Sequence, residues 1–341
     1  MVFRIGDFSE VHDKKKRAAG VVFGSQMKNM KVRQRQNTQN KRLSSGTQFD
    51  IGSTGTLQLA SLPGIQAFAD RAVLGFLKSF AGLHRDQNMQ NWQQDFRLGA
   101  GVGRYKIDVL YGMDAGWAVE GAVGSEYKID ATYLSPHVNM ASRCMSACKQ
   151  YGVKVLLSQA VEELLSKEAR SKMRHLDTVY VKGSNVEQRI YTYDARHEGV
   201  DFFLFERSPD QADKESDTYN PSIWENDQDL KSMRQHVTKE FMQTFSAGVD
   251  KYLEGKWKEA IRKFQKAENL MFEEVVEQGY VEYMNEDLGE YGKITCTSRE
   301  EIDRLKEEFG DGASRCLIQF MQKYDGIPPP DWHGVRHLTS K

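Results

Sequence analysis

Residues 111–155 read YGMDAGWAVEGAVGSEYKIDATYLSPHVNMASRCMSACKQYGVKV, and this stretch decides the fold. Its first part carries four glycines among apolar residues, namely Gly112, Gly116, Gly121 and Gly124. Glycine permits the backbone angles of tight turns, so this part predicts two short strands joined by a turn. The second part has apolar residues at helical spacing from Val138 to Tyr151. Gly152 then follows as a typical helix C-terminal signal, which predicts a helix over 138–151.

Two polar residues of that predicted helix form a candidate binding pair. Asn139 and Arg143 are four residues apart, so on a helix they project from one face. A neutral amide beside a fixed cation suits a ribose and a phosphate. Each residue also has an ordinary structural interpretation. Asn is a favoured N-cap, and Arg on a helix is usually an exposed surface charge.

The order of motifs around this helix resembles that of the class III nucleotidyl cyclase domain, in the form found in cyclase-like proteins of protists. The matching segments are GWAVEGAVGS at 116–125, DATYLSPHVNMASR at 130–143 and VKG at 181–183. The resemblance implies that Asn139 orients the ribose and that Arg143 stabilises charge on the α-phosphorus as the 3′-hydroxyl attacks it. It also implies that Thr132 reads the purine and Lys182 contacts the phosphates. Taken alone, Thr132 could be an ordinary strand residue and Lys182 a hairpin residue.

The chain departs from the family pattern in three places. The family's usual Gly-Asp before V-N is replaced by the tripeptide Ser135-Pro136-His137, and its usual His before the first glycine is Asp114. In the family the N-terminal half of the domain carries two aspartates for two metal ions, and this half is expected to be missing from the chain. Asp7, in the tripeptide Ile-Gly-Asp, is a candidate for the second metal aspartate, and a chance match stays open.

The resemblance carries expectations about cofactors, partners and activity. It implies two Mg²⁺ (or Mn²⁺) ions in a site formed between two cyclase domains, with a nucleoside triphosphate as substrate. The chain is therefore expected to form cAMP or cGMP and pyrophosphate, in intracellular signal transduction, when paired as a homodimer or with a second cyclase domain. The alternative is a catalytically inactive subunit or scaffold that acts through dimerisation and its C-terminal helices.

Composition narrows the functional class. The net charge is −1, which gives no bulk electrostatic reason for a nucleic-acid partner. Four cysteines in 341 residues do not make a disulfide framework, so we expect buried thiols in a reducing cytosol. There is no apolar run near the roughly 20 residues that cross a bilayer and no secretory signal pattern, so the expected location is cytoplasmic.

The predicted fold class is α+β: a ferredoxin-like class III cyclase sheet with helices on one face, followed by a C-terminal helical region. Residues 1–60 are predicted to be a disordered basic leader or insertion, and residues 61–195 a partial cyclase-like domain. Residues 196–240 are predicted to be an acidic linker. Residues 241–341 are predicted to be a helical region and tail, in which Gly248, Ala260, Phe264 and Ala267 suggest a tetratricopeptide-like hairpin.

Overall fold

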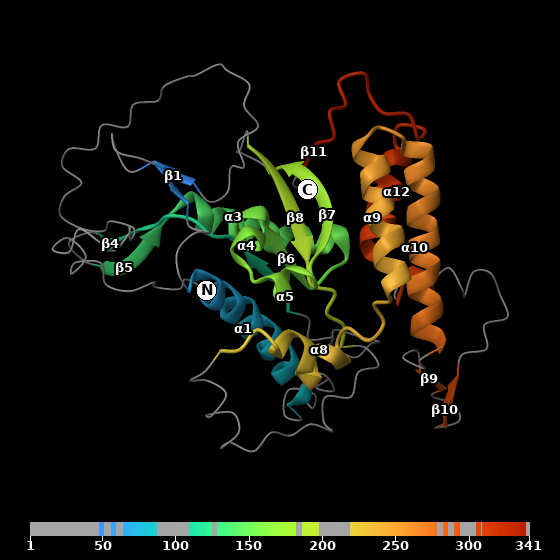
Figure 1. Ribbon diagram of the computed structural model, residues 1–341, viewed down its shortest axis with the longest axis horizontal. Helices are drawn as coiled ribbons and strands as arrows, with labels where there is room; N and C mark the ends of the chain where they lie inside the picture. Colours follow the sequence, from blue (N-terminus) through green and yellow to red (C-terminus); the bar gives the residue numbers. More distant parts are fainter. Residues whose placement is uncertain are drawn as a thin grey trace.

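The computed structural model describes residues 48–50, 56–58, 64–86, 109–124, 128–181, 186–197, 219–277, 282–285, 290–293, 305–307 and 309–338 (Figure 1). Two predicted site residues, Asp7 and Lys182, lie outside the described residues. So does most of the predicted basic leader, of which only residues 48–50 and 56–58 are described.

A mixed five-stranded sheet forms the centre of the fold, in the order β11-β7-β8-β6-β3. Its strands are β3 (Tyr111–Met113), β6 (Val155–Ser158), β7 (Arg174–Tyr180), β8 (Glu187–Thr192) and β11 (Arg336–His337). The pairs β7–β8 and β6–β8 are antiparallel, whereas β3 runs parallel to β6 and β11 parallel to β7. The C-terminal segment therefore supplies an edge strand of the same sheet as the segment quoted above.

Helices cover both faces of this sheet, because its strands are apolar on both sides. In β6, Val155 and Leu157 join one buried cluster and Leu156 joins another. A strand buried on both faces reads as a continuous apolar run, as Val-Leu-Leu does here. The predicted placement of helices on one face is therefore wrong, although the mixed α/β class is confirmed.

The helices divide between the two clusters as follows. The cluster containing Val155 is formed with α1 (Ile65–Arg85), α4 (Gln159–Leu164), α5 (Lys167–Arg170), α7 (Ile223–Asn226) and α8 (Gln228–Ser232). The cluster containing Leu156 is formed with α3 (Pro136–Tyr151), α9 (Lys239–Leu253), α10 (Trp257–Glu277) and α12 (Gly312–Gln322). Figure 1 shows α9, α10 and α12 side by side at one end of the molecule.

Among the described residues, three two-stranded hairpins lie outside the central sheet. They are β1 (Gln48–Asp50) with β2 (Thr56–Gln58), β4 (Val119–Gly124) with β5 (Ile129–Leu134), and β9 (Glu282–Asn285) with β10 (Glu290–Lys293). The β4–β5 hairpin is the predicted pair of strands. It extends away from the central sheet next to α3 (Figure 1).

Part of the segment predicted as an acidic linker packs against α1. Trp224 in α7 is 3% exposed, and its indole N–H donates to Asp70 of α1 at 3.3 Å. Lys78 of α1 forms ion pairs with Asp227 at 2.5 Å and with Asp229 at 2.9 Å. The acidic residues of this segment are therefore partners for basic residues of α1, and the domain boundaries stay a prediction.

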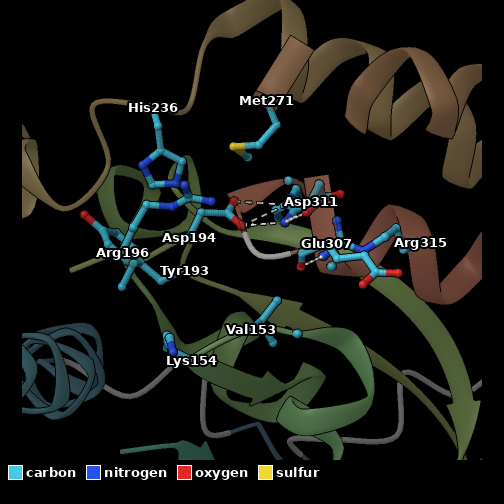
Figure 2. Close-up of a pocket in the computed structure, with 15 residues that line it drawn as sticks. Val153, Lys154, Tyr193, Asp194, Arg196, His236, Met271, Glu307, Asp311 and Arg315 are labelled. Atoms are coloured by element: carbon cyan, nitrogen blue, oxygen red, sulfur yellow. Dashed lines mark hydrogen bonds and ion pairs between the residues drawn. The ribbon is translucent and has the colours of Figure 1, made fainter. Parts of the chain in front are cut away.

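A buried arginine joins the sheet to the C-terminal helices. Arg174, the first residue of β7, pairs with Asp194 after β8 and with Asp311, the N-cap of α12. Figure 2 shows the two carboxylates facing each other at a cavity of about 200 Å³ between the sheet and the helices. The cavity is lined by residues of the sheet region and by residues of the C-terminal helical region. None of the predicted site residues that the structure describes is among them.

Candidate functional site

Helix α3 carries the predicted site, and its boundaries follow from local sequence signals. The Ser135 hydroxyl accepts a hydrogen bond from the His137 amide at 2.9 Å, and Pro136 occupies the first helical position. Gly152 ends the helix in the left-handed conformation, with φ of 63°. The predicted helix is thus confirmed, and it begins two residues earlier than expected. Asn139 is not its N-cap, so the ordinary structural interpretation of Asn139 is wrong.

Helix α3 packs closely against β3, and this contact determines which face of the helix is buried. A Cβ atom at Gly112 would lie 2.2 Å from both the Ala141 carbonyl oxygen and the Met145 backbone nitrogen. Only glycine permits this approach. The buried face carries Met140, Cys144 and Cys148 among other residues.

The remaining surface of α3 carries the predicted pair. Asn139 is exposed and Arg143 is half-buried, four residues apart on the same helix. An amide and a guanidinium in this position can donate to oxygen atoms of a bound sugar and phosphate. Their roles towards a nucleotide remain a prediction.

The predicted purine-reading residue lies on the strand that leads into α3. Thr132 is half-buried on β5 and is the register partner of Gly121 on β4. Only Ser135 separates the end of β5 from the start of α3, so Thr132, Asn139 and Arg143 belong to two consecutive elements. Lys182 follows Val181, which is buried, but Lys182 itself is outside the described residues.

The two described departures from the family pattern meet in space. His137 Nδ1 lies 2.8 Å from Asp114 Oδ2, and the Ser158 hydroxyl donates to Asp114 Oδ1 at 2.5 Å. The side chain of Asp114 is 1% exposed and that of His137 is 29% exposed. The sequence marks each residue as a departure from the family pattern, but it does not pair them, because they are 23 positions apart and no periodicity relates them.

Asp114 also influences a neighbouring thiol. Burial raises the pKa of Cys144 well above its ordinary value, and the negative charge of Asp114 raises it further. A thiol with a raised pKa stays protonated and unreactive at neutral pH. Cys144 is therefore a packing residue of the buried face of α3, and sequence analysis correctly left it out of the candidate site.

Exposed apolar side chains lie along the β4–β5 hairpin and at the start of α3. Trp117 is 41% exposed, Ile129 and Leu134 at the two ends of β5 are 70% and 56% exposed, and Val138 is 43% exposed. A two-stranded hairpin is marginally stable by itself in water, and exposed apolar patches often mark protein–protein contacts. We call these four residues the hairpin patch.

The described part of the chain does not contain a metal site. Within it there is no group of three or more His, Cys, Asp or Glu side chains that could hold an ion. Asp7, the predicted metal ligand, is outside the described residues. Among the described helices, none is both long and apolar enough to cross a bilayer.

Comparison with known proteins supports the family resemblance. The family model for the adenylate and guanylate cyclase catalytic domain matches residues 9–195, a range that begins two residues after Asp7. An adenylate cyclase of Anabaena cylindrica is 36% identical over 91 residues, which are 26% of this chain and 18% of the relative. The terminal-differentiation specific adenylate cyclase of Dictyostelium discoideum is 31% identical over 98 residues, which are 28% of this chain and 5% of the relative. The matches thus span less than a fifth of these relatives.

Proposed function

Because this chain belongs to the family of adenylate and guanylate cyclase catalytic domains, we propose that it forms a cyclic nucleotide and pyrophosphate from a nucleoside triphosphate when it is paired with another cyclase domain. The observation that carries the proposal is the construction of α3. Ser135 is the N-cap of the helix, so Asn139 is not needed for capping. Asn139 and Arg143 both lie outside the buried face of α3. A ferredoxin-like arrangement of the strands is part of the same proposal.

The reaction is an internal phosphoryl transfer. The 3′-oxygen of the ribose forms a bond to the α-phosphorus, the bond to the pyrophosphate oxygen breaks, and the 3′-hydroxyl proton is released to solvent. The protein contributes alignment and charge stabilisation. Asn139 orients the ribose by hydrogen bonds to its oxygens, and Arg143 stabilises the charge that develops on the α-phosphoryl oxygens.

The other predicted residues act on the two ends of the substrate. Thr132 contacts the purine through its hydroxyl, and Lys182 binds the terminal phosphates as a point charge. The base could be adenine or guanine. Divalent ions are part of the family resemblance, but the described residues offer them no ligand set, so the chemistry assigned to this chain is that of its own side chains.

The hairpin patch supports a requirement for pairing. Its four apolar side chains lie on or next to the β4–β5 hairpin and at the start of the helix that carries Asn139 and Arg143. Burying them against a second cyclase domain would stabilise the β4–β5 hairpin and bring the partner's residues next to α3. The partner is a second copy of this chain or another cyclase domain.

The test uses the purified full chain with ATP or GTP, alone and mixed with a complete cyclase catalytic domain from a relative. We expect little product from the chain alone and cyclic nucleotide from the mixture. Arg143→Ala should lower turnover in the mixture by about 100-fold or more, with a much smaller loss of nucleotide affinity. Arg170→Ala, which removes an exposed arginine of α5, is the matched control. Absence of product in every mixture, or equal effects of the two variants, would contradict the proposal.

An inactive pairing subunit is the second candidate, and the hairpin patch favours it equally, because that surface needs no catalytic residue. Trp117→Ser separates the two candidates. In both cases it should weaken association with a cyclase domain, measured by sedimentation. An inactive subunit would change the partner's turnover without any dependence on Arg143.

A further inference from the structure

We propose that Asp114 and His137 are positioning residues, a hydrogen-bonded clamp that fixes the start of α3 on the sheet and thereby sets the direction of Asn139 and Arg143. The clamp is a property of this chain's own geometry. Its consequence for turnover rests on the proposed function. Neither residue belongs to a motif that the family resemblance assigns to substrate.

The Asp114 carboxylate joins three elements of the fold. It follows β3, its Oδ2 atom contacts His137 in α3, and its Oδ1 atom accepts from Ser158 at the end of β6. Ser158 is also the N-cap of α4, yet its hydroxyl makes no capping hydrogen bond there. An N-cap hydroxyl normally accepts a hydrogen bond from a helix amide. The Ser158 hydroxyl instead donates to the buried Asp114 carboxylate, which needs donors because it is shielded from water.

A carboxylate that is almost completely buried needs a compensating charge. Removing an ion from water without a partner is costly, and proteins pair such groups or keep them neutral. The imidazole of His137 faces Oδ2 at 2.8 Å, and the Ser158 hydroxyl donates to Oδ1. Each carboxylate oxygen therefore has a hydrogen-bond partner, and removing either partner would leave a buried polar atom unsatisfied.

The loop between β3 and β4 is shaped around the His137 ring. A Cβ atom at Gly116 would lie 2.1 Å from the ring carbon Cδ2, so only glycine leaves room for the imidazole. The Ser135 hydroxyl, which accepts from the His137 amide, also donates to the carbonyl oxygen of Trp117. The side chain and the backbone of His137 are therefore both fixed against residues 114–117.

The position of the clamp explains why it would matter for the reaction. His137 is two residues before Asn139, about 200° around the helix, so it holds the side of α3 that faces the sheet while Asn139 faces away. The close approach of Gly112 to Ala141 and Met145 is the second fixed point. The two points lie on either side of Asn139 and the second also flanks Arg143, so together they fix the rotation and the rise of this segment. A misplacement of about 1 Å can cost about 100-fold in rate.

The experiment compares three variants of the full chain with the unchanged protein. Asp114→Asn and His137→Gln each disrupt the contact between the two side chains while retaining a polar group. Lys172→Gln removes an ion pair of 2.6 Å between Lys172, which follows α5, and Glu225 of α7; it lies outside α3 and is the matched control. The first readout is hydrogen exchange of the amides of residues 137–143. The second is turnover and nucleotide affinity in the mixture with a complete cyclase domain.

We expect exchange at residues 137–143 to rise by about tenfold or more in both clamp variants, as for loss of one buried hydrogen bond, and not in the control. Turnover should fall by about 10- to 100-fold, with nucleotide affinity changed by less than about threefold. The reciprocal double variant Asp114→His with His137→Asp should recover part of both losses, because it restores the contact with its two members exchanged.

The outcomes separate the two proposals. If exchange rises in the clamp variants but no mixture makes product, the clamp stands and the proposed function fails. If product forms and depends on Arg143, while the clamp variants leave exchange and turnover unchanged, the clamp is refuted. If Asp114→Asn does not fold, His137→Gln at a partly exposed position decides. Exchange in that variant equal to that of the unchanged protein refutes the clamp.

Discussion

Arg174 offers a direct measure of how strongly the C-terminal helices are attached to the cyclase sheet. Its guanidinium is 3% exposed and contacts Asp194 through Nε at 3.0 and 3.1 Å, and Asp311 through its terminal nitrogens at 2.9 and 3.0 Å. It also lies 4.9 Å and 4.2 Å from the ring centroids of Phe241 and Phe245 in α9. Arg174→Met keeps an unbranched side chain and removes the charge from this junction.

The expected cost follows from what the substitution leaves behind. Asp311 keeps hydrogen bonds from the Ser314 amide at 2.9 Å and the Ser314 hydroxyl at 2.6 Å, whereas Asp194 loses its Arg174 contacts. Removing one partner of a buried ion pair costs about 3–5 kcal/mol. Burial raises the pKa of Asp311, but the charge of Arg174 and the hydrogen bonds outweigh it and lower the pKa overall. The junction therefore stabilises the ionised carboxylate.

Urea unfolding measures this cost as a change in midpoint at constant slope. Arg170→Met is the control, because Arg170 makes an ion pair of 3.0 Å with Glu162 while 45% exposed, and exposed pairs contribute about 1 kcal/mol or less. We expect Arg174→Met to lower the free energy of unfolding several times more than Arg170→Met. Equal effects of the two variants would refute the reasoning, since the junction would then be no stronger than a surface contact.

Three further predictions concern pH, acid stability and packing. Burial lowers the pKa of His175 to about 4 from 6.5, so the unfolded chain binds its proton first and stability should fall between about pH 6.5 and 4, by no more than about 3 kcal/mol. His175→Gln should flatten that part of the pH–stability curve, and His333→Gln, at an exposed position, should not. Because the pKa of Asp311 is lowered, its contribution should be lost as pH falls below about 4, and Asp311→Asn should remove that acid dependence in urea titrations. Gly112→Ala should destabilise the chain by about 1–3 kcal/mol, while Gly121→Ala, with open space around it, should have little effect in thermal unfolding.

The features that the sequence could predict are those with local causes. A helix over 138–151 follows from apolar spacing and a terminal glycine, and the β4–β5 hairpin follows from glycines between β-branched residues. The candidate pair Asn139 and Arg143 needs only helical periodicity and the motif order. These inferences depend on residues within one or two turns of each other, where spacing determines geometry.

The features that the sequence could not predict depend on contacts between distant segments. Asp114 and His137 are 23 positions apart, and Arg174 and Asp311 are 137 positions apart. No periodicity relates such residues. The second helical layer was missed for a similar reason, because Leu156 lies between Val155 and Leu157 in one apolar run and does not reveal that a C-terminal bundle covers its side of the sheet.

A buried carboxylate contacts each end of helix α3. Asp114 contacts its first turn, and Asp177, which contacts its last residue, also pairs with Arg336 in the C-terminal segment. Tyr151, the last residue of α3, donates to Asp177 of β7 at 2.7 Å, and Arg336 of β11 pairs with the same carboxylate at 2.9 Å. Asp114 holds the other end through His137. The residues that fix the candidate catalytic face therefore come from β3, β6, β7 and β11. Because β11 follows α12 in the chain, Arg336 connects α3 to the C-terminal segment through Asp177 and Tyr151. On these contacts, the C-terminal region belongs to the support of the site.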